Sequence, residues 1–133
     1  MALEESRTTR DYLYGRLLAI ADQIEGRALY LAGEKRETGA ARLMQRFSDR
    51  PASTWKTIEV GLTPYKSRLR VSRGGFLQVM IDLMTNVTAA FAFDDFVSDH
   101  PLSGEFLLGY HCQRQALRAN PNATADSESS PDQ

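Results

Sequence analysis

The side chains with the greatest chemical potential stand together in the stretch GYHCQRQ, from Gly109 to Gln115. A cysteine beside a histidine suggests a thiol nucleophile with its general base. On a helix, however, His111 and Cys112 are successive residues that point about 100° apart and do not face one partner. Such a nucleophile also needs a third group to orient its base, and the spacing supplies none. We interpret the stretch as a packing segment and expect no catalytic residues.

The sequence lacks the residues that a metal site or a phosphate-binding loop needs. The chain has one cysteine and two histidines, and neither histidine lies at helical spacing from another ligand. Gly74-Gly75 predicts a turn, since it lacks the motif of a phosphate-binding loop. We expect no metal, cofactor or small-molecule substrate. The single cysteine excludes an internal disulfide, and no window of about 18 residues is apolar enough to span a bilayer, so the sequence favours a cytoplasmic protein with no membrane partner.

Charge is distributed unevenly along the chain. Residues 1–34 carry four basic and six acidic side chains, residues 74–133 carry two and eight, and residues 35–73 carry ten and three. The middle third is therefore a candidate polyanion-binding surface. Within it, two series of cations recur at helical spacing, preceded by a basic pair. The predicted nucleic-acid-binding residues are Lys35, Arg36, Arg42, Arg46, Arg50, Lys66, Arg70 and Arg73.

Two functions remain open for this basic segment. One basic stripe is ordinarily a solvated face, but two stripes with few acids favour phosphate binding. No aromatic residue is interleaved on these faces to stack on bases, so we expect contacts with a nucleic-acid backbone and no sequence readout. The alternative is a structural helical adaptor whose basic face binds acidic protein surfaces. Salt-dependent binding of random single-stranded DNA would distinguish the two.

Helices must position these side chains, because apolar residues recur at spacings of three and four and no strand-like alternation is present. We predict a single all-α bundle over residues 1–118, of about five helices, and a disordered tail over residues 119–133, which lack any large apolar residue. The predicted helices run from Thr8 or Thr9 to Gly33, over 39–48, 53–71 and 76–91, and from Ser103 to about Arg118.

Two of these helices carry particular expectations. The third has a regular apolar seam, and Pro64 lies off that seam, so we predict a kinked but continuous helix. The seam comprises Trp55, Ile58, Leu62, Tyr65 and Leu69. The fourth helix is apolar nearly all round, which is typical of the central helix of a bundle.

Two segments resemble a known family. YLYGRLLAIADQIEG (Tyr12–Gly26) is similar to the GRLxA helix in the C-terminal part of the large subunit of type I-C CRISPR Cascade, the Csd family. PLSGEFLLGYHCQRQAL (Pro101–Leu117) is similar to the closing segment there, LS…FxLGYYHQR. Order and spacing agree over about residues 10–118. The chain departs at His111 and Cys112, where the family pattern has Tyr-His, which argues further against chemistry by these two side chains.

The resemblance implies a particular role. Type I-C systems make a separate small subunit by internal translation within the large-subunit gene, and a chain with only the C-terminal helical region resembles that subunit. The implied partners are the backbone subunits, the large subunit, a second copy of the chain, crRNA and target DNA. The implied function is to scaffold the complex and stabilise the R-loop, whose formation is nearly balanced in free energy. The motifs transfer no DNA-contacting residues to numbered positions.

Overall fold

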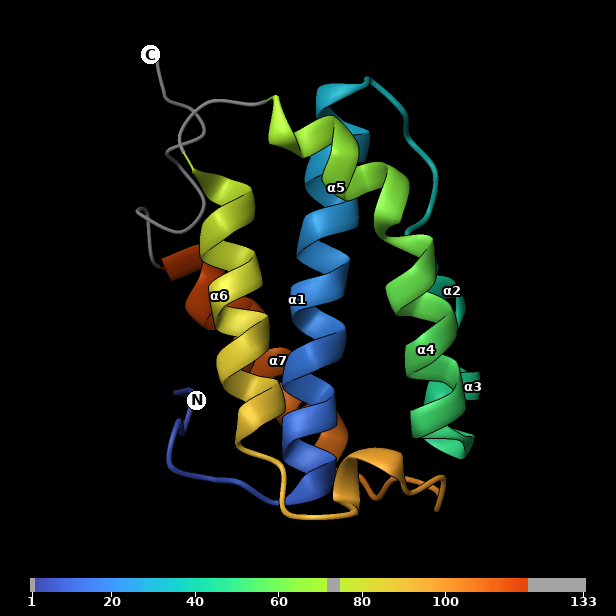
Figure 1. Ribbon diagram of the computed structural model, residues 1–133, viewed down its shortest axis with the longest axis vertical. Helices are drawn as coiled ribbons and strands as arrows, with labels where there is room; N and C mark the ends of the chain where they lie inside the picture. The colour runs from blue at the N-terminus through green and yellow to red at the C-terminus, as the bar shows by residue number, and fades with distance from the viewer. Residues whose placement is uncertain (1, 72–74, 120–133) are drawn as a thin grey trace.

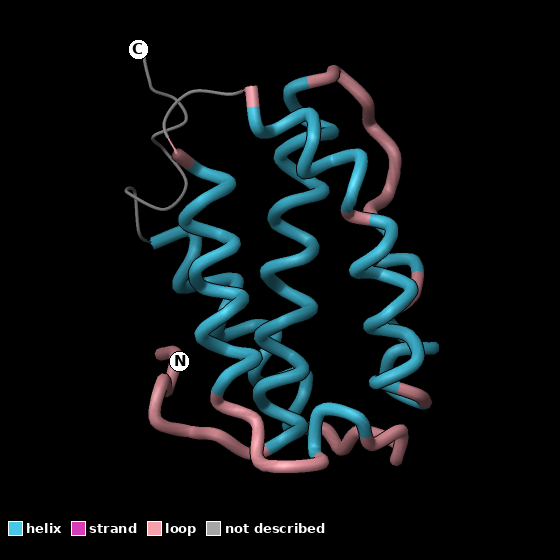
Figure 2. Tube along the Cα trace, viewed as in Figure 1, coloured by secondary structure: helices cyan, strands magenta, loops and turns pink. Residues whose placement is uncertain are grey.

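A computed structural model describes residues 2–71 and 75–119. This part of the chain folds into seven α-helices and one 3-10 helix, without strands (Figures 1 and 2). The predicted all-α class is confirmed. Gly75, in the turn predicted at Gly74-Gly75, has a positive φ of 71°, and Ala119, the first residue of the predicted tail, ends α7. Gly74 and the tail from 120 onward lie outside the described residues. The elements are α1 Arg10–Leu31, α2 Gly39–Arg42, α3 Met44–Asp49, α4 Pro51–Gly61, α5 Thr63–Arg70, α6 Phe76–Ala89, η1 Asp95–Val97 and α7 Glu105–Ala119.

The central helix is α1. Figure 1 shows it between α6 on one side and α4 on the other, with α7 passing behind it. Every residue from Tyr12 to Ala21 is buried, so all faces of this stretch are covered. The prediction that the fourth helix is central was wrong: α6 exposes Val79 and its polar side, with Asp82 among the exposed residues. Gly15 on α1 lets α7 approach closely, which an apolar stripe alone does not indicate.

Two glycines allow α1 and α7 to pack backbone against backbone. A Cβ atom added at Gly15 would lie 2.7 Å from the backbone nitrogen of Tyr110 on α7. One added at Gly109 would lie 3.0 Å from the carbonyl carbon of Tyr12 on α1, and closer still to its oxygen. Each helix thus places a glycine where the other helix crosses it. Both glycines belong to the two motifs that carry the family resemblance.

The N-terminal ends of α1 and α7 lie side by side and stabilise each other. The hydroxyl of Thr9, at the N-cap position of α1, donates to Glu105 at 2.8 Å and not to its own helix. Asp11 accepts the backbone N–H of Ser103 at 2.8 Å. Partial burial opposes ionisation of Asp11, but the hydrogen bonds from Ser103 and Arg10 outweigh it and lower the pKa of this carboxyl. The two helices therefore start together, and α7 then crosses behind α1 (Figure 1).

The second and third predicted helices are each divided into two. At Leu43 the backbone leaves helical geometry (φ −100°, ψ 10°), which separates α2 from α3. At Leu62 it stays in the right-handed helical region, and the N–H of Lys66 bonds to the Leu62 carbonyl at 2.8 Å. Pro64, near the start of α5, has no N–H to continue the hydrogen-bond ladder, so α4 and α5 are two helices that meet at a bend.

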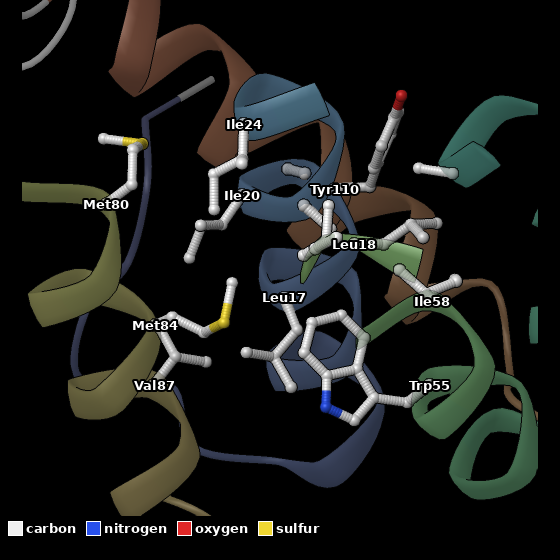
Figure 3. Packing of buried hydrophobic residues seen from close by; sticks show 14 of the residues in the cluster. Leu17, Leu18, Ile20, Ile24, Trp55, Ile58, Met80, Met84, Val87 and Tyr110 are labelled. Carbon is white, nitrogen blue, oxygen red and sulfur yellow. The ribbon is translucent and has the colours of Figure 1, made fainter. Parts of the chain in front are cut away.

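The third-helix seam faces the core as predicted. Trp55, Ile58, Leu62 and Leu69 are buried in one cluster with Leu17, and Tyr65 is half-buried against it. Figure 3 shows the indole of Trp55 against Leu17, between α4 and α1.

Within the described residues, no helix combines the length and the apolar character needed to cross a bilayer.

Replacing Trp55 by alanine should destabilise the protein by about 3–5 kcal/mol, because the indole is 2% exposed and its removal leaves a cavity beside α1. Chemical denaturation followed by circular dichroism measures this change. Lys56→Ala, at an exposed position one residue further along α4, is the control and should change stability little. A small effect of Trp55→Ala would contradict the packing role of the seam.

Candidate nucleic-acid interface

The stretch GYHCQRQ lies on α7 and serves the packing of that helix. Tyr110 and Cys112 are buried, whereas His111 is exposed and its ring contacts the edge of Tyr110. Gln113, 2% exposed, accepts a 2.7 Å hydrogen bond from the buried guanidinium of Arg16. Burial lowers the pKa of Arg16. The histidine and the cysteine thus lie in different environments, and the described part of the chain holds no group of three or more metal-ligating side chains.

Neither His111→Ala nor Cys112→Ser should alter nucleic-acid binding once the amount of folded protein is matched. His111 is exposed, and Cys112 is a small buried side chain. Cys112→Ser should cost some stability because it buries a hydroxyl. Filter binding at equal folded concentration, with folding checked by circular dichroism, measures the effect. Markedly weaker binding by well-folded protein would show that the stretch has a direct role.

The basic segment covers one side of the bundle, over α2 to α5. Six predicted contact residues lie here without a side-chain hydrogen bond or ion pair to another residue of 2–71 or 75–119, and all but the half-buried Lys66 are exposed. Arg73 lies outside the described residues. Cations that are unpaired within the described chain can neutralise an external polyanion without first breaking an internal ion pair. The six are Lys35, Arg42, Arg46, Arg50, Lys66 and Arg70.

Arg36 differs from the other predicted residues because it is engaged within the chain. Its guanidinium donates to the hydroxyl of Tyr65 and to Glu34 at 3.2 Å, and it lies 3.7 Å from Glu25. The hydrogen bonds with Tyr65 and Glu34 raise the pKa of Arg36. Arg68, 3.5 Å from Glu34, contacts the face of the same tyrosine. Arg36 and Arg68 therefore fasten the segment between α1 and α2 onto α5.

A small hollow opens between α2, α4 and α5, with Glu25 of α1 at its base. It holds about 180 Å³. Arg42 belongs to its lining, and Tyr65 forms an aromatic part of the wall between Arg36 and Arg68. We call it the arginine pocket, lined by Glu25, Gly39, Arg42, Leu43, Thr57, Ile58, Gly61 and Tyr65.

The second cation series faces a different hollow. Lys66 lines a groove of about 450 Å³ between the α4–α5 pair and α6, together with Glu59 and Met84. Arg70 follows one turn later on α5 and is exposed. The structure therefore places Arg42 and Lys66 at separate hollows, and not in one common groove. The first series is also interrupted: Arg42 ends α2, Arg46 lies in α3, and Arg50 joins α3 to α4.

Two residues of this surface were missed in the sequence. By its spacing Tyr65 belongs to the apolar seam, but its ring also reaches the basic surface, so the expectation that no aromatic residue accompanies the cations was wrong. Arg68 belongs to neither cation series and is therefore not among the predicted residues. Its position three residues after Tyr65 on one helix is the signal that could have indicated this contact.

Comparison with known protein families gives a match over most of the chain. A family model described as CRISPR-associated protein (Cas_Csd1) matches residues 1–118. No curated protein matches the chain. The matched span includes the whole basic segment and both glycines of the α1–α7 crossing.

Proposed function

Because this chain belongs to the Cas_Csd1 family of CRISPR-associated proteins, we propose that it is the non-catalytic small subunit of a crRNA-guided type I-C surveillance complex. In this role it scaffolds the complex in the cytoplasm, beside the backbone subunits, the large subunit and a second copy of itself. It stabilises the R-loop through contacts to the DNA backbone that do not depend on sequence. Family membership supports the CRISPR setting, and the two sequence motifs support the small-subunit role.

The observation that carries the DNA contact is the set of unpaired cations on α2 to α5. Arg42, Arg46 and Arg70 are exposed and make no side-chain ion pair within the described residues. In contrast, Arg7 pairs with Glu105, and Arg10 pairs with Asp11 at 2.9 Å, near the start of α1. Since DNA unwinding and heteroduplex formation nearly cancel in free energy, a few phosphate contacts are enough to favour the R-loop.

Binding of random single-stranded DNA to the full chain tests this proposal. Fluorescence anisotropy at several salt concentrations should give an affinity that falls linearly with salt on logarithmic axes, with a slope of about −0.7 per phosphate contact. Reconstituted complex that lacks the chain should form R-loops less readily than complete complex. Absence of DNA binding, combined with normal incorporation into the complex, would favour the adaptor that binds acidic protein surfaces.

A further inference from the structure

We infer that the arginine pocket receives one unpaired base of single-stranded DNA, and that it favours a base with an exocyclic amino group, such as cytosine, over thymine. This inference rests on the proposed function, because it adds a base contact to a surface proposed to bind the DNA backbone. It differs from the proposed function because it gives the surface a preference for one kind of base, which charge alone does not supply.

The floor of the pocket presents a hydrogen-bond acceptor. Glu25 is 6% exposed, and its Oε1 accepts the backbone N–H of Gly39 at 2.8 Å. Its Oε2 lies 3.7 Å from the guanidinium of Arg36. A carboxylate offers about four acceptor sites, so these contacts leave capacity for a ligand donor. A carboxylate pairs well with the N4 amino group of cytosine. Thymine carries the carbonyl O4 at that position and therefore offers the carboxylate no exocyclic donor.

The walls and the rim suit the rest of a nucleotide. Leu43 and Ile58 give apolar surface against which a base can pack, and Tyr65, whose ring already contacts Arg36 and Arg68, completes the wall. Arg42 lines the pocket and has no side-chain partner among the described residues, so its guanidinium group can donate hydrogen bonds to a phosphate. Charge excludes two other occupants. A lysine or arginine of a partner protein would meet Arg42 in the lining and Arg36 beside Glu25, and a partner carboxylate would meet Glu25.

The decisive comparison is between oligo(dC) and oligo(dT) of equal length, measured with the full chain by fluorescence anisotropy. The two carry the same backbone charge and pyrimidines of similar size, so they differ at the edge that Glu25 would read. We expect oligo(dC) to bind about tenfold more tightly, within the range for one good base contact. Oligo(rC) distinguishes the source of the base: tighter binding of the RNA would overturn the assignment to DNA.

Three variants locate the preference. Glu25→Gln removes the charge but keeps an oxygen that can accept the Gly39 N–H. Gly61→Leu fills the mouth of the pocket, where an added Cβ meets no atom within 4 Å. Both should reduce the dC-to-dT affinity ratio towards one and leave oligo(dT) binding nearly unchanged. Glu59→Gln is the matched control, with the same change of charge on α4 but facing the other groove, and should keep the ratio.

The outcomes separate this inference from the proposed function. Equal affinity of the unmodified chain for oligo(dC) and oligo(dT), with a normal salt dependence, would reject the base pocket and leave the backbone contacts standing. A preference that survives both Glu25→Gln and Gly61→Leu would place base recognition elsewhere and also reject the pocket. Failure to bind either oligonucleotide would reject both proposals. Should Glu25→Gln unfold the chain, Gly61→Leu alone still decides the question, since its added Cβ has open space around it.

Discussion

Replacing Gly109 by alanine should lower the free energy of unfolding by about 3 kcal/mol or more, at or beyond the upper end of typical overpacking costs. The added methyl group would overlap the main chain of Tyr12, with the carbonyl carbon only 3.0 Å away. A backbone atom in a buried helix cannot rotate aside as a side chain can. The methyl group is therefore accommodated only if α1 and α7 move apart. Gly15→Ala, which approaches α7 from the other side, should have a similar effect.

The chain offers a matched control on α1 itself. A Cβ at Gly26 would lie 4.0 Å from Thr38, an ordinary contact, so Gly26→Ala should stabilise the protein by about 0.5–1 kcal/mol through helix propensity. Urea denaturation of Gly15→Ala, Gly26→Ala and Gly109→Ala gives the three values directly. Similar behaviour of all three variants would mean that helix propensity, and not the close crossing, governs these positions.

The double variant Arg42→Glu/Arg46→Glu should weaken binding of the assembled complex to target DNA, with little dependence on target sequence. The salt slope should flatten by about 0.7–0.9 for each phosphate that is no longer neutralised, hence by about 1.4–1.8 for the pair. Both arginines are exposed and lie outside the buried cluster, so folding and assembly should persist. Lys66→Glu/Arg70→Glu should act similarly if both hollows face DNA.

Comparing the two pairs tests whether either side of α4–α5 contributes to DNA binding, because Arg42 and Lys66 line different hollows. Arg118→Glu, which reverses one exposed charge near the end of α7, is the control and should leave the slope unchanged. Size-exclusion chromatography of each variant complex checks assembly. An unchanged slope for both pairs, with normal assembly, would reject DNA contact by these residues. Failure of the complex to assemble would show that the basic surface meets protein.

Periodicity in the sequence is enough to establish the helical class, the approximate position of each helix and the burial of the third-helix seam. Residues three or four apart share one face of a helix whatever that face packs against, so these features need no knowledge of the neighbouring helices. Charge along the chain likewise identifies the basic segment. The division between α2 and α3 at Leu43 cannot be predicted from periodicity, because the apolar spacing passes through that position without a break.

The identity of the central helix and the grouping of the cations depend on tertiary packing. The close packing of α1 on α7 requires Gly15 to meet the main chain of α7 and Gly109 to meet that of α1, although the two segments are distant in sequence. The arginine pocket likewise joins Glu25, Arg42 and Tyr65 from three helices, while Lys66, one residue after Tyr65, faces another groove. Periodicity fixes the face on which a residue lies along its own helix. It carries no information about which other helix that face meets, because packing between helices sets that relation.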